Sequence, residues 1–154
     1  MGNPPLIYNF IIILLSSIIA YGCNSTKNGF QNAKRSFIPC DINEVLKTEK
    51  KIGHVSTKQV FGFVCSLKME CQTNIEFTEF SNKVLFKLLD QEPEVLLSTL
   101  ADSTLDKRFL YLQLSAPLLD YDIKTLIDKV KKSKGEESIK QQVISNLLIG
   151  MGSQ

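Results

Sequence analysis

The feature that most constrains the fold is a series of short apolar stripes after residue 40, each bounded by a helix cap or a helix breaker. Within each stripe the apolar residues recur at intervals of three and four, which is typical of amphipathic helices rather than strands. The stripes predict helices over about residues 42–52, 56–72, 78–89, 94–101, 103–116, 122–134 and 136–150. We therefore expect an all-α fold, either a helical bundle or a short α-solenoid of about five to seven antiparallel helices.

The starts and stops of these helices have recognisable chemistry. Asp41 is placed to cap the first helix, Gly53 to stop it, and Pro93 to open the fourth at its first helical position. Ser56 is placed to start the second helix, and Asp120 or Asp122 to cap the sixth. The best candidate for a strand is the briefly alternating stretch 73–80. Asn74 within it is a typical turn or cap residue, so this stretch fits the start of a helix better.

One internal echo points to a repeat. Leu88-Leu89-Asp90 is followed by apolar residues at a spacing that recurs thirty residues later, after Leu118-Leu119-Asp120. The period lies near that of helical-hairpin repeats. This pattern resembles the HEAT and TPR families of α-solenoids, which implies stacked helix pairs. An irregular bundle of leucine-rich helices is the alternative.

The first 22 residues differ sharply from the rest of the chain. An apolar run, Phe10–Ala20, has the length of the hydrophobic region of a secretory signal and is shorter than a membrane span. No Lys or Arg precedes it, so the usual basic region is missing. We expect a signal peptide over residues 1–22, with a retained anchor helix as the alternative.

The segment Ala20-Tyr21-Gly22-Cys23 that follows resembles the lipobox of bacterial lipoproteins. That resemblance implies that Cys23 is lipidated and becomes the first mature residue. Residues 23–38 are mostly polar and predict a flexible tether, followed by a helical domain over residues 39–150. The expected location is the bacterial cell envelope, on the periplasmic or outer-membrane side. A plainly secreted protein is the alternative.

Three cysteines remain after Cys23, and an exported protein favours disulfides. Residues six apart in one helix lie about 9 Å apart along its axis, whereas a disulfide needs Cα atoms within about 7 Å. A Cys65–Cys71 bond is therefore possible only if the helix ends between them. A Cys40–Cys71 bond has no such restriction. A third interpretation is that all three are buried apolar residues.

Charge and composition argue against several functions. The net charge is +2, and the one basic cluster, Lys131-Lys132-Lys134, falls at a predicted helix C-terminus, where cations offset the helix dipole. We therefore expect no nucleic-acid partner. The single histidine, His54, and the cysteine spacing do not match a zinc site, so we expect no metal and no cofactor. No catalytic motif is present, and we expect a protein that is not an enzyme.

The candidate interaction residues lie on the third and fifth helices. The expected buried stripe of the fifth helix is Leu105, Phe109, Leu112 and Ala116. Arg108 and Tyr111 lie off that stripe, and both residue types are favoured at interface hot spots. Phe86 lies off the stripe of its own helix. The alternative is that neighbouring helices cover these positions.

These observations predict a non-catalytic, lipid-anchored envelope protein that binds another protein through a helical surface. A second possibility is an inhibitor or immunity-type protein that neutralises an envelope enzyme or toxin. A third is a carrier of a small apolar ligand, which would need a cavity between helices.

Overall fold

The computed structural model describes residues 38–118 and 121–152. They form seven α-helices and one 3₁₀ helix, η1, with no strand among the residues described. In chain order the elements are α1 (Ile42–Glu49), α2 (Thr57–Ser66), η1 (Met69–Thr73), α3 (Ile75–Gln91), α4 (Pro93–Leu100), α5 (Arg108–Leu114), α6 (Ile123–Lys132) and α7 (Glu137–Met151). The predicted all-α fold is confirmed.

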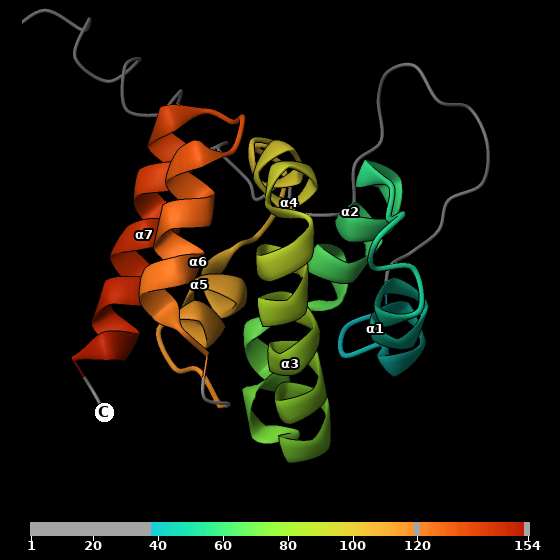
Figure 1. Ribbon diagram of the computed structural model, residues 1–154. Helices are drawn as coiled ribbons and strands as arrows, with labels where there is room; N and C mark the ends of the chain where they lie inside the picture. Colours follow the sequence, from blue (N-terminus) through green and yellow to red (C-terminus); the bar gives the residue numbers. More distant parts are fainter. Residues whose placement is uncertain (1–37, 119–120, 153–154) are drawn as a thin grey trace, which may run out of the picture.

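The longest helix, α3, is the centre of the bundle (Figure 1). The hairpin of α1 and α2 lies on one side of α3, and the hairpin of α6 and α7 lies on the other. α4 packs against α2, α3 and both helices of the second hairpin, while α5 packs against α3 and α7. α5 therefore lies between α3 and α7, and it must present apolar side chains to both helices.

The thirty-residue echo does not mark a structural repeat. Leu88, Leu89 and Asp90 lie inside α3, whereas Leu118 lies exposed in the segment after α5. Leu119 and Asp120 lie outside the described residues. The helices also do not stack in chain order, because α5 packs on α7 and α2 packs on α4. The fold is an irregular bundle rather than a solenoid.

Several helix boundaries follow from the predicted caps. The side chains of Asp41, Ser56 and Asp122 accept hydrogen bonds from first-turn amides of α1, α2 and α6. These bonds pair N–H groups that have no partner within the helix. Pro93 opens α4 at its first turn. Residues 73–80 are not a strand, because Asn74 accepts a 3.1 Å hydrogen bond from the amide of Phe77 and starts α3.

Other boundaries differ from the prediction. The second helix ends at Ser66, not near residue 72, and the chain turns through η1 before α3. The last helix continues through Gly150 to Met151. A side chain at Gly150 would meet the Pro117 ring, because an added Cβ would lie 2.9 Å from Pro117 Cδ. Glycine is therefore required there by the close approach of α7 to the segment after α5, rather than as a helix stop.

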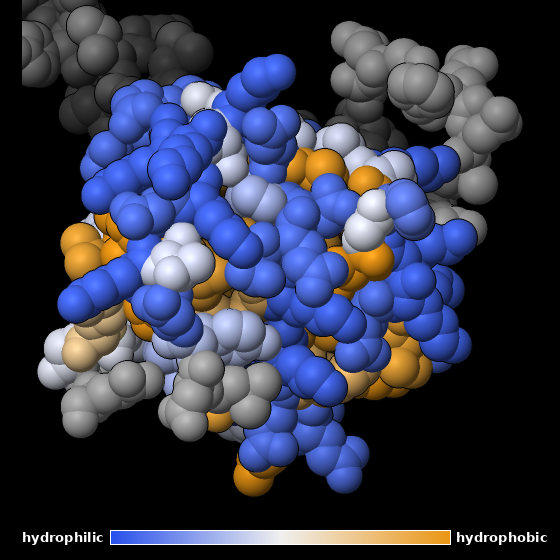
Figure 2. All heavy atoms as spheres, in the orientation of Figure 1, coloured by the Kyte–Doolittle hydropathy of each residue, from blue (hydrophilic) through white to orange (hydrophobic). Residues whose placement is uncertain are grey.

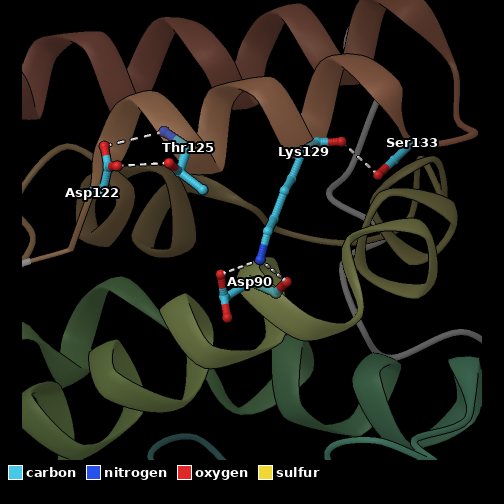
Figure 3. A network of polar contacts seen from close by, with 5 residues as sticks. All are labelled: Asp90, Asp122, Thr125, Lys129 and Ser133. Atoms are coloured by element: carbon cyan, nitrogen blue, oxygen red, sulfur yellow. Dashed lines mark hydrogen bonds and ion pairs between the residues drawn. The ribbon is translucent and has the colours of Figure 1, made fainter.

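α3 and α6 are joined by an ion pair. Lys129 Nζ lies 2.6 Å from Asp90 Oδ1 and 3.0 Å from the Asp90 carbonyl oxygen (Figure 3). The lysine therefore neutralises a carboxylate and also pairs with a carbonyl near the C-terminal end of α3, where such oxygens lack helical partners. Both side chains are partly exposed, so the pair orients the two helices more than it stabilises them.

A disulfide joins Cys40 to Cys71 with Cα atoms 5.5 Å apart. Of the two pairings that the sequence left open, the structure thus contains Cys40–Cys71, and the buried Cys65 takes no part in it. The bond fixes η1 to the start of the described chain. The Cys40 amide also donates to the Ser66 carbonyl at 3.0 Å, across the same junction. Cys40 has a φ of 57°, a conformation uncommon for residues other than glycine.

Replacing both Cys40 and Cys71 with serine is expected to lower the free energy of unfolding by about 3.7 kcal/mol, the loop-closure entropy of a loop of this length. Urea denaturation of the oxidised protein and the double variant measures the difference. A reductant should shift the parent toward the variant and leave the variant unchanged. A parent midpoint that is insensitive to reductant would contradict this assignment.

Candidate functional site

The structure corrects the prediction for Phe86. Its side chain has no exposed area, and its ring stacks on that of Tyr121 with centroids 4.8 Å apart and planes inclined by 20°. Phe86 therefore belongs to the core between α3 and the start of α6, and it cannot contact a partner in this fold. The ring of Tyr121 covers it, and burial raises the pKa of Tyr121, with a further contribution from Asp90.

Arg108 is exposed, but two of its five N–H donors are engaged by Asp106. Its Nε and Nη2 atoms donate to the two oxygens of Asp106 at 2.9 and 2.7 Å. This paired geometry orients the guanidinium before any partner binds. The hydrogen bond from Arg108 lowers the pKa of Asp106 to about 2, so the carboxylate stays charged through the neutral range. Arg108 can still offer the flat face of its guanidinium to a partner.

Tyr111 links α5 to α7. Its hydroxyl donates a 2.7 Å hydrogen bond to Gln142 Oε1, and the partial burial of the ring raises its pKa. The phenol is therefore protonated at neutral pH, and the residue is partly exposed. The predicted site residues Arg108 and Tyr111 thus share one helix, and Tyr111 contacts α7, while Phe86 lies in the core.

The expected buried stripe of α5 is wrong in two positions. Leu112 is 44% exposed, and Ala116, which lies beyond the end of α5, is exposed too, whereas Leu110 and Leu114 are fully buried. The reason is that α5 packs on both α3 and α7, so its buried surface is wider than a single stripe.

Large apolar side chains are exposed near the C-terminal end of α7: Leu148, Ile149 and Met151. Figure 2 shows apolar atoms along the edge of the molecule that α7 forms, beside a largely hydrophilic face. Ile149 follows Gln142 by seven residues, which is two helical turns, so both lie on the same face of α7. We call Arg108, Tyr111, Gln142, Leu148 and Ile149 the α5–α7 surface.

A buried polar network beneath α5 was not predicted from the sequence. Asn82 of α3 donates through Nδ2 to the carbonyls of Gln113 and Ala116 at 3.1 and 3.3 Å, and its Oδ1 accepts from the Leu118 amide at 3.3 Å. It therefore pairs with backbone groups where α5 ends. A signal was present in the sequence, because Asn82 lies three and seven residues before Leu85 and Leu89 and so falls on the same face of the predicted helix as these apolar residues.

Gln113 extends this network. Its Nε2 donates to Ser81 Oγ at 2.7 Å and to the Thr78 carbonyl at 3.3 Å. Its Oε1 is buried and accepts no hydrogen bond, the one such side-chain atom found among the described residues. Buried polar atoms are normally paired, so an unpaired acceptor in a native fold calls for an explanation.

The described residues contain no group of three or more His, Cys, Asp or Glu side chains that could hold a metal ion. None of the helices in residues 38–118 and 121–152 is long and apolar enough to cross a membrane. The predicted signal peptide, the lipidation site Cys23 and nearly all of the predicted tether lie outside the described residues.

Comparison of the chain with protein-family models, curated proteins and solved structures finds no match. The function is therefore argued from the residues of the chain itself.

Proposed function

We propose that this is an exported, lipid-anchored protein of the bacterial envelope that has no catalytic role and binds another protein through the α5–α7 surface. The observation that carries the proposal is the exposure of Leu148 and Ile149 on α7, the helix to which Tyr111 of α5 is joined through Gln142. Exposed apolar side chains that adjoin one another on packed helices commonly mark interaction sites.

The composition of the surface favours a protein partner. Arg and Tyr are enriched at the energetic centres of protein interfaces, and buried aliphatic contacts supply much of the remaining affinity. The Arg108–Asp106 pair and the Tyr111–Gln142 hydrogen bond orient the polar residues before binding. A pre-organised surface loses less conformational entropy when the partner docks.

The anchor is proposed from the leader alone. The resemblance of Ala20–Cys23 to a lipobox supports lipidation of Cys23, which would place the helical domain at a membrane surface in the envelope.

Changing Cys23→Ala is expected to move the protein from the membrane fraction to the soluble fraction of the envelope, because the acylated sulfur would be lost. Fractionation of cells that express either form, with immunodetection, measures the distribution. As a control, Cys65→Ala leaves the leader intact and should not change the fractionation. A Cys23→Ala variant that remains as membrane-bound as the parent contradicts lipidation as the anchor.

The surface is tested with the double change Leu148→Glu and Ile149→Glu. Two charges placed on an apolar contact should reduce recovery of the partner by at least tenfold in affinity capture from an envelope extract, since burying an unpaired charge is costly. Quantitative mass spectrometry measures the recovery. Ile75→Glu is the matched control, because Ile75 is also an exposed apolar residue but lies at the start of α3.

Equal recovery with all three proteins, or no partner with the parent, contradicts this proposal. An inhibitor or immunity-type role makes a further demand on any recovered partner. The captured protein must be an enzyme or toxin, and its activity must be abolished by stoichiometric addition of the parent but not of the double variant.

A further inference from the structure

A groove lies beside α5, on the side that faces α3 and η1 rather than α7. Its volume is about 390 Å³, and its walls include Gln72, Thr78, Asn82, Phe109, Leu112 and Leu118. Three segments far apart in sequence therefore build it: η1, α3 and the stretch from α5 to Leu118. The volume falls within the range of small-molecule sites, about 300–1,000 Å³.

None of the residues that line this groove is charged. Two other cavities differ in this respect: one beside α1 and α2 is lined by Glu44, Lys47 and Lys58, and one beside α4 is lined by Glu94 and Lys134. The groove offers amide, hydroxyl, aromatic and aliphatic groups in their place. A charged ligand would lose its hydration there without gaining a counter-ion, so the lining favours a neutral ligand.

Gln113 also lines the groove, and its Oε1 is the buried acceptor without a hydrogen bond. The nitrogen end of the same amide is held by Ser81 and Thr78. Exchanging the nitrogen and oxygen of the amide would not resolve this, because it would set oxygen against the Thr78 carbonyl. The acceptor is therefore a fixed feature of the site, and a donor brought by a ligand would satisfy it.

We propose that this groove binds a small, neutral, mostly apolar molecule that carries one O–H or N–H group, and that this group donates to Gln113 Oε1. Leu112 and Leu118 are about half exposed beside the groove, so they can change rotamer and admit the donor to the shielded oxygen. The site is separate from the α5–α7 surface, and the inference does not rest on the protein-binding proposal.

The test uses three aromatic probes of similar size: naphthol, its methyl ether and naphthoate. Each is titrated into the purified protein, and binding is followed by proton–nitrogen NMR correlation spectra. We expect naphthol to shift the amide signals of Leu112, Gln113 and Leu118. The methyl ether should bind about fivefold more weakly because it lacks the donor, and naphthoate about tenfold or more weakly because it is charged.

Two variants locate the site. Leu112→Glu should weaken naphthol binding about tenfold by placing a charge in the groove wall, whereas Leu148→Glu, equally exposed but on α7, should leave it unchanged. Gln113→Leu should make naphthol and the methyl ether bind with equal affinity. A general loosening of the fold would weaken the binding of both probes but would leave the ratio of their dissociation constants unchanged. The spectra of the free variants report whether each is folded.

The absence of shifts at the groove up to the solubility limit of naphthol would overturn the proposal. So would naphthoate binding as tightly as naphthol, or equal weakening by Leu112→Glu and Leu148→Glu. These results concern the groove alone, and the capture experiment on the α5–α7 surface is read independently of them.

Discussion

The buried amide of Asn82 holds the C-terminal end of α5 against α3, and the positions of both proposed binding regions depend on that contact. One side chain, 1% exposed, pairs with two carbonyls and one amide of the chain that leaves α5. The Gln113 carbonyl also accepts a 3.2 Å hydrogen bond from the Ala116 amide, and the Ala116 carbonyl and the Leu118 amide lie beyond the last residue of α5. Removing the Asn82 side-chain amide would break the three hydrogen bonds that tie this segment to α3, at a net cost of about 0.5–1.5 kcal/mol for each bond.

This anchor determines which side chains of α5 face inward and which face outward. With the end of the helix held on α3, Tyr111 faces α7 and bonds Gln142, while Leu112 lines the groove on the opposite side. The Cys40–Cys71 disulfide fixes η1, which supplies another wall of that groove. The α5–α7 surface and the groove are thus two sides of one short helix, positioned by polar contacts rather than by its own seven residues.

The sequence allowed accurate prediction wherever the determining interaction is local. Helix caps act within one helical turn, and the structure has the predicted ones at Asp41, Ser56 and Asp122. The proline at the start of α4 is equally local and is also present. The all-α class followed from the same periodicity. The sequence did not show whether one continuous helix runs through Cys65 and Cys71. The helix breaks before η1, and that break depends on the packing of η1 against α3 and α5.

Prediction failed where a side chain is covered by a distant element. Phe86 lies off the main stripe of α3, but α3 is surrounded by other helices and Tyr121 stacks on it. Leu112 fits the predicted stripe of α5 but is exposed, because the buried side of the helix is centred on Phe109, Leu110, Gln113 and Leu114. The unpaired oxygen of Gln113 was equally unpredictable, since it depends on where α3 places Ser81 and Thr78.

The most direct test of the anchor is hydrogen exchange on Asn82→Ala, compared with Asn146→Ala. Asn146 is a helical asparagine whose amide bonds only within its own helix, to the Gln142 carbonyl. The anchor predicts that Asn82→Ala increases exchange by about tenfold or more for the amides of α5 and Leu118, whereas Asn146→Ala leaves them protected. Unchanged protection of α5 in Asn82→Ala would contradict the account.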